Sequence, residues 1–187
     1  MAEWLRSGLQ SRLHRFDSGR RLALTAYTPA AWSDLFVAAA GASAALAGLV
    51  FVAVSINLQR ILALPGLPER ALETLMLLFG VTVVSLLGLI PGQSDTALGL
   101  ELLVQSIVWI AVIVPLVVKT LPGPDDPRGW YVSRIGLVAP ALVSFAVGGI
   151  SVLAGSGGGL YWTAAGIVAA LVAGVANAWV LLVEIQR

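Results

Sequence analysis

The sequence predicts an all-α protein, a polytopic transmembrane helical bundle of five spans preceded by an N-terminal amphipathic segment. Its composition is the first reason, since 58% of the 187 residues are hydrophobic and only 11% are charged. A soluble domain is typically about 45–50% apolar and about 25% charged. The second reason is that the apolar residues gather in five long stretches, which short polar turns separate. Most of the chain is therefore expected to lie in lipid.

Each of the five stretches is long enough to cross the hydrocarbon layer. A helix rises about 1.5 Å per residue and the layer is about 30 Å thick, so a span needs about 20 apolar residues. The predicted spans cover approximately residues 35–58, 71–90, 97–118, 132–153 and 160–183. The connections LPGLPER, PGQSDT, LPGPDDPRG and GSGGG are rich in turn residues. Residues 34–187 are therefore predicted to form a single transmembrane bundle.

The first 33 residues have a different pattern. Apolar side chains recur every three to five residues and arginines fall between them, which is typical of an amphipathic helix in the headgroup layer. A solvated, poorly ordered tail is the alternative. The pattern is carried by Trp4, Leu5, Leu9, Leu13 and Phe16, with Arg6, Arg12 and Arg15 between them.

The composition also excludes many kinds of active site. The chain has no cysteine, one histidine (His14) and one lysine (Lys119), so thiolate sites, histidine-ligated metals and a phosphate-binding loop lack their residues. The formal net charge of +1 gives no reason to expect a nucleic-acid partner. We therefore expect no cofactor, no metal and no enzymatic activity.

The distribution of basic residues bears on orientation. In a five-span bundle the N-terminal segment lies on the same side as PGQSDT and GSGGG and brings five arginines there. The other side holds six basic residues, namely Arg60, Arg70, Lys119, Arg128, Arg134 and Arg187. If only the loops are counted, the positive-inside rule predicts a protein of a bacterial inner membrane whose C-terminus faces the cytoplasm. An N-terminus inside, or insertion in both orientations, are the alternatives.

Small residues recur at helical spacing in three spans and predict close helix packing. These faces serve either the fold of the bundle or contact with a second copy or another membrane protein. They comprise Gly41, Ala44 and Gly48 in the first span, Gly136, Ser144 and Gly148 in the fourth, and Gly166, Ala170 and Gly174 in the fifth.

One carboxylate, Glu101, is predicted at membrane depth, about four residues inside the third span. Gln105 follows one turn later, while Asp95 lies just outside the third span and Asp34 begins the first span on the same side. Ionisable groups in a span are costly and suggest an ion or proton path. The alternative is a glutamate that reaches headgroup water or a donor on a neighbouring helix.

Three further polar residues are expected to form interhelical hydrogen bonds. Ser55 and Asn57 close the first span, and Asn177 lies near the end of the fifth. Charged residues at the ends of the spans are expected to pair at the basic interface; they are Glu73, Glu184, Arg60, Arg70 and Arg134.

One further pattern is the string WSDLFVAAAGASAALAGLVFVAVSINLQRIL, which is followed by LPGLPERALETL, LIPGQS and GGGLYW…NAWVLLVEI. These segments resemble a group of small bacterial integral membrane proteins common in actinobacteria. The resemblance covers about residues 27–187. Some members of this group are labelled as modulators of the FtsH protease, and no chemistry is attached to the shared segments.

Two functions fit these observations. The first is an accessory, regulatory or scaffold membrane protein that acts through helix–helix contacts as an oligomer or with another membrane protein. The alternative is a small homo-oligomeric ion channel or transporter with Glu101 and Gln105 on the permeation path.

Overall fold

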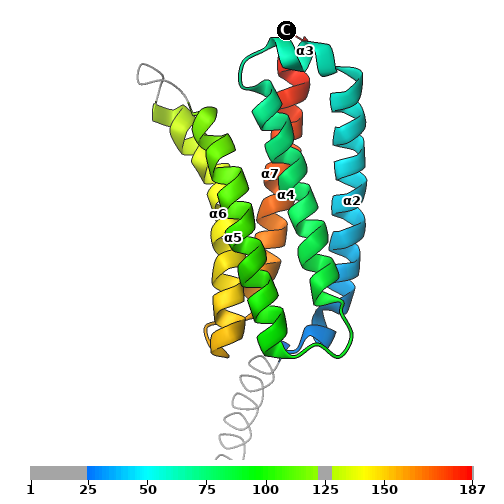
Figure 1. Ribbon diagram of the computed structural model, residues 1–187, viewed down its shortest axis with the longest axis vertical. Coiled ribbons are helices and arrows are strands. Elements are labelled where there is room, and N and C mark those ends of the chain that lie inside the picture. The colour runs from blue at the N-terminus through cyan, green and yellow to red at the C-terminus, as the bar shows by residue number, and fades with distance from the viewer. Residues whose placement is uncertain (1–24, 122–127, 187) are drawn as a thin grey trace, which may run out of the picture.

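The computed structural model describes the backbone of residues 25–121 and 128–186 (Figure 1). It describes the side chains of residues 25–121 and 135–183. Within these ranges every regular element is helical. The elements are η1 (Pro29–Trp32), α2 (Ser33–Ile56), α3 (Leu58–Ala63), α4 (Leu67–Gly88), α5 (Asp95–Lys119), α6 (Arg128–Ala154) and α7 (Leu160–Gln186).

Five of the described helices are long and apolar enough to cross a membrane, which confirms the predicted fold class. They run alternately up and down, so that α3 and the C-terminal end of α7 lie at one end of the bundle (Figure 1). The α4–α5 and α6–α7 connections lie at the other end, together with η1. Both loops therefore share a side with the start of the first span, as the sequence predicts.

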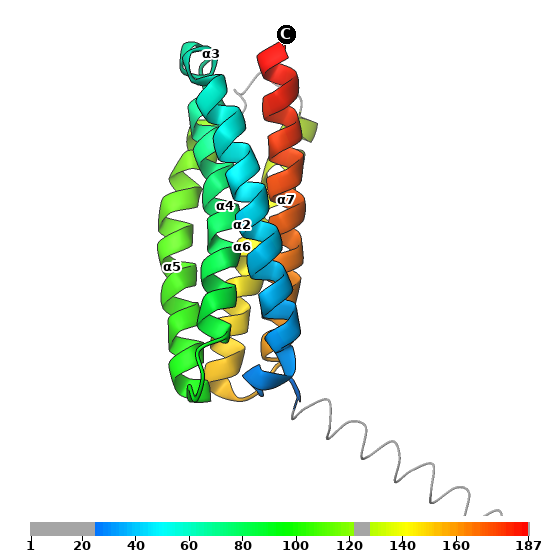
Figure 2. The ribbon, with the colours of Figure 1, turned by 90° about the vertical axis from the view of Figure 1, so that its right-hand side faces the viewer.

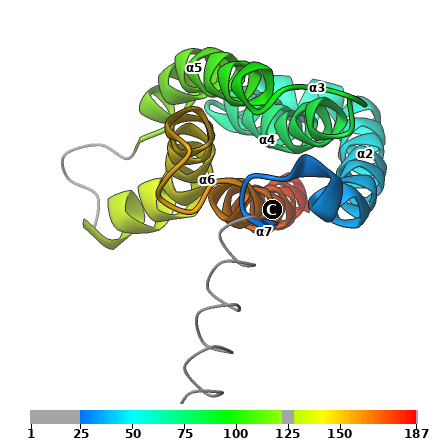
Figure 3. The same cartoon turned by 90° about the horizontal axis from the view of Figure 1, so that it is seen from below.

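Helix α4 is the most buried of the five candidate spans. It packs extensively against α2, α5 and α7, while α6 packs against α5 and α7. Viewed along the long axis, α2 and α7 are neighbours at one side of the bundle, with η1 between them at this end (Figure 3). These two helices make few contacts with each other. They lie close near η1 and diverge toward the α3 end (Figure 2).

Residues 25–32 are part of the bundle, although the sequence analysis assigns them to the amphipathic segment. The Leu160 backbone N–H donates to the Ala26 carbonyl oxygen at 2.8 Å, and the Gly158 N–H donates to the Tyr27 hydroxyl at 3.0 Å. Gly159 (φ +51°) allows residues 26–27 to approach the α6–α7 connection closely, since a Cβ there would lie 2.7 Å from the Tyr27 ring. The bundle therefore begins before residue 34. The amphipathic pattern of residues 1–24 lies outside the described residues.

The boundary between the first two spans also differs from the prediction. The first span ends at Ile56, and α3 then turns across the end of the bundle, where Ile61 is buried in a cluster with Leu67 and Leu181. The second span begins at Leu67 instead of residue 71. Pro68 lies in the first turn of α4, where its missing N–H costs no helical hydrogen bond.

Candidate functional site

A carboxylate and an amide meet inside the bundle between α4 and α7. Glu73 is fully buried and Asn177 is 1% exposed. The Asn177 Nδ2 group donates to Glu73 Oε1 at 2.9 Å. Glu73 lies about 7 Å along α4 from the midpoint of that helix. A buried carboxylate at this depth must have hydrogen-bond partners, because an unpaired charge in lipid is strongly unfavourable.

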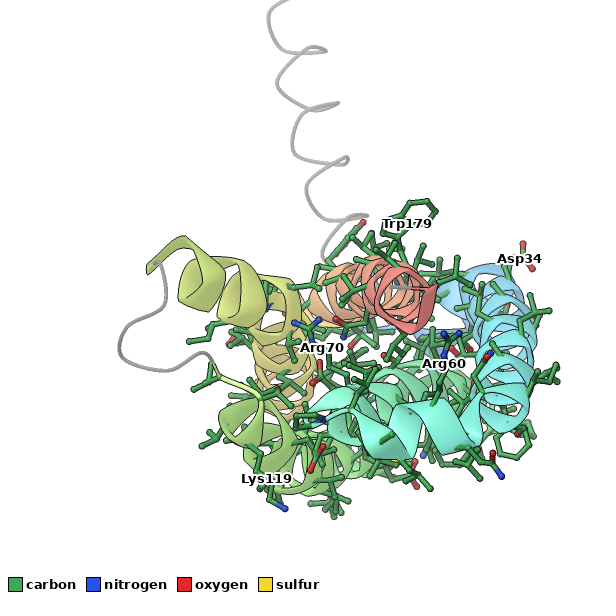
Figure 4. The ribbon with its side chains drawn as sticks, turned by 90° about the horizontal axis from the view of Figure 1, so that it is seen from above. Asp34, Arg60, Arg70, Lys119 and Trp179 are labelled. Atoms are coloured by element: carbon green, nitrogen blue, oxygen red, sulfur yellow. The ribbon has the colours of Figure 1, made fainter. Side chains whose placement is uncertain are left out.

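Close approach of α7 to α4 positions this pair. Gly174 lies three residues before Asn177, and a Cβ there would lie 2.8 Å from Leu78 Cδ2. Arg70, one turn before Glu73 on α4, points toward the interior of the bundle, whereas Lys119 and Asp34 point away from it (Figure 4). The α3 end of the bundle therefore carries polar and charged groups inside its outline.

The sequence predicts Asn177 as an interhelical contact and Glu73 at the membrane interface. The predicted start of the second span at residue 71 put Glu73 in the first turn of its helix, next to headgroups. The structure starts α4 four residues earlier, so Glu73 lies almost two turns inside. Pro68 followed by Glu69 was the available indication of an earlier helix start.

The second polar contact joins α5 to α4. The Gln105 Nε2 group donates to the Gly80 carbonyl oxygen at 2.9 Å, and Trp109 Nε1 donates to the Met76 carbonyl oxygen at 2.8 Å. The donors are one turn apart on α5 and the acceptors are one turn apart on α4. Because Gly80 has no side chain, the indole packs directly on the α4 backbone. Gln105 therefore holds two helices together.

The residues of the predicted ion path do not converge on one another. The half-buried Glu101 is hydrogen bonded to Gln93, which precedes α5, while Gln105 is buried against α4. Asp95 and Asp34 are both exposed, and Asp34 points away from the bundle (Figure 4). The interhelical hydrogen bonds connect Gln105 to α4 and leave Glu101 at the loop.

Two of the predicted interhelical contacts are wrong. Ser55 Oγ donates to the Phe51 carbonyl oxygen, and Asn57 Nδ2 donates to the Ala53 carbonyl oxygen. Both acceptors lie one turn earlier in α2, because hydroxyl and amide groups near a helix end readily bond the preceding turn. A side-chain hydrogen bond between α2 and α4 links Ser43 Oγ and Thr82 Oγ1 at 2.8 Å.

The small-residue faces on α6 and α7 are used largely within the bundle. A Cβ at Gly166 would lie 2.8 Å from Phe145, and one at Gly148 would lie 2.7 Å from Thr163 Oγ1. Ala170 is fully buried and Ser144 is 8% exposed. Gly136, at the other end of the α6 row, has open space around its Cβ position.

The α2 row is different, because it faces away from the bundle. Gly41 and Gly48 have no atom within 4 Å of a Cβ position, and Ala44 is exposed. Phe36 and Ala39, which are buried, lie on the opposite face of this helix. Among the residues that the structure describes, nothing covers this helix surface, which admits close backbone approach.

Within the described residues no group of three metal-ligating side chains occurs. Comparison of the chain with family models, curated proteins and solved structures finds no match. The resemblance to small actinobacterial membrane proteins therefore stays a prediction.

Proposed function

We propose that this chain is an accessory scaffold of a bacterial inner membrane that assembles with a second copy of itself through the outward face of α2. The observation that supports the proposal is the open space at Gly41 and Gly48, in contrast to the packed glycines Gly166 and Gly174. Helices in lipid associate through close van der Waals contact, and small residues permit it. α2 is also the least buried of the five candidate spans.

The orientation that we propose places α3 and the C-terminus in the cytoplasm. Arg60, Arg70 and Lys119 lie at this end of the bundle, whereas Asp34 and Asp95 lie at the other end. This distribution agrees with the positive-inside rule.

Cysteine cross-linking tests the α2 contact directly, because the chain has no native cysteine. We expect Ala44→Cys to form a disulfide-linked dimer in liposomes, whereas Val172→Cys on the exposed face of α7 does not. Adding Gly48→Leu should weaken association about tenfold, equivalent to about 1.4 kcal/mol, because the larger side chain separates the backbones.

The matched control is Gly136→Leu, which makes the same change at an open position on α6. It should leave the cross-linked fraction of the Ala44→Cys protein unchanged. Equal cross-linking of Ala44→Cys and Val172→Cys, or equal loss with both leucine variants, would contradict assembly through α2.

Proton or cation transfer is a second candidate function, and the buried carboxylate of Glu73 is the observation that favours it. Glu73, instead of Glu101, is the carboxylate inside the bundle, and Asn177 stabilises it. An acidic group at membrane depth is a common component of proton pathways. In this alternative Glu73 carries the proton, and Glu101 remains a loop contact.

Flux through liposomes separates these possibilities. If the protein conducts, we expect Glu73→Gln to abolish proton or cation flux, because the amide cannot carry a proton, whereas the matched change Glu101→Gln leaves flux unchanged. Loss of flux in Glu101→Gln alone would favour the path predicted from the sequence. Absence of flux in the unmodified protein would exclude the transport candidate and leave the scaffold.

A further inference from the structure

A groove runs between α2 and α7 where these helices diverge. Two adjoining cavities of about 250 and about 230 Å³ form it, and they share four lining residues. Leu78 of α4 forms part of its floor. Small side chains at Ala53 and Ala178 leave the space between the two helices open. The groove is therefore a consequence of small residues on both walls.

The groove extends along one half of the bundle. Its inner end lies at Leu46, Leu78 and Gly174, each near the middle of its own helix, and its outer end lies at Asn57 and Arg60. The eleven-residue separation of Leu46 and Asn57 corresponds to about 16 Å of helical rise. This length is about half of the 30 Å hydrocarbon layer, which is one leaflet.

The two ends of the groove differ in chemistry. Apart from Asn57 and Arg60, the lining side chains are apolar. Arg60 is exposed and points into the groove from α3 (Figure 4). No hydrogen bond or ion pair of the Arg60 guanidinium occurs in the part of the chain that the structure describes. A guanidinium at the membrane interface is a strong partner for a phosphate.

The length and polarity of the groove favour a lipid as its occupant. Its apolar part spans about one leaflet, and the Arg60 side chain lies at its outer end. The groove therefore has the length and polarity of one lipid tail below one headgroup.

We propose that the α2–α7 groove binds an anionic phospholipid of the surrounding leaflet, with an acyl chain between the helices and its phosphate against Arg60. The site is independent of the proposed assembly, because Gly41, Ala44 and Gly48 lie on the other side of α2. A bound tail fills the space that α2 and α7 leave between them. The lipid thereby completes the packing of α2 on the bundle.

Native mass spectrometry of the full chain, released from vesicles of phosphatidylcholine with 10 mol% phosphatidylglycerol, tests this proposal. We expect one retained phosphatidylglycerol per chain, in preference to phosphatidylcholine. Arg60→Gln should reduce that preference about fivefold, the contribution of one basic residue near an anionic surface. Ala178→Phe, which fills the groove at a residue lining both cavities, should abolish retention of either lipid.

Two matched variants serve as controls. Lys119→Gln removes a basic residue at the same end that points away from the bundle (Figure 4), and Val172→Phe enlarges a side chain on the exposed face of α7. Both should retain the lipid as the unmodified chain does. Equal retention of the two lipids, or an unchanged preference in Arg60→Gln, would overturn the proposal. Loss of self-association in Ala178→Phe without loss of lipid would assign the groove to a second copy instead.

Discussion

Replacing Gly80 by alanine is expected to lower the free energy of unfolding by about 2–3 kcal/mol, the upper part of the range for overpacked cores. The new methyl group would lie 2.9 Å from Trp109 Cδ1 and closer still to its ring nitrogen. The indole cannot move away freely, because Trp109 Nε1 donates to the Met76 carbonyl oxygen. Displacement of α5 would also break the Gln105 hydrogen bond to Gly80.

The measurement is reversible unfolding in mixed micelles, with Gly136→Ala as the matched control. Gly136 lies in a helix with open space around its Cβ position, so alanine there is expected to be neutral or slightly stabilising through helix propensity. A loss of stability in Gly136→Ala equal to that in Gly80→Ala would show that the effect arises from glycine in a helix and not from the α4–α5 contact.

The second large effect is expected at the Glu73–Asn177 pair. Asn177→Leu should destabilise the protein by about 2–3 kcal/mol, because it removes a donor from a fully buried carboxylate. Glu73→Leu should cost less, since it takes one hydrogen bond from a neutral amide, whereas Asn177→Leu takes one from a buried carboxylate. Glu73→Gln keeps an oxygen that accepts from Asn177 and should be the mildest change.

A double-mutant cycle checks this order in the same unfolding assay. The variant carrying both Glu73→Leu and Asn177→Leu should lose less stability than the sum of the two single losses, because each change removes the same hydrogen bond. Strictly additive losses would contradict direct coupling of the two side chains. They would assign the cost of each change to its other neighbours in the bundle.

The spans could be predicted from the sequence because their signal is local. Length and mean apolar character of consecutive residues identify a span, and all five predicted stretches correspond to helices of the structure. The sequence does not fix the ends of the spans, since Pro68 and Glu69 suit a loop and a first helical turn equally well. That ambiguity displaced Glu73 from the interior to the interface.

The candidate sites could be predicted only in part. Asn177 was correctly expected to bond across helices, whereas Ser55 and Asn57 bond their own helix. Gln105 was correctly identified as a residue within a span but binds the α4 backbone. A side chain in a lipid-embedded helix finds an acceptor in its own preceding turn or on a neighbour, and sequence spacing does not distinguish the two.

The sequence by itself determined that the chain belongs in lipid, how many times it can cross, and which loops share a side. These properties add up residue by residue along the chain. The tertiary structure decided which helix faces meet. Helices that are apolar on most sides show no distinct buried face in their sequence. Contacts such as that between Glu73 and Asn177, which are 104 residues apart, are therefore not visible in the local sequence. Only the packed bundle reveals that the glycines of α7 contact neighbouring helices, whereas the Cβ positions of the α2 glycines face open space. It also reveals that α2 and α7 diverge around a groove that ends at Arg60.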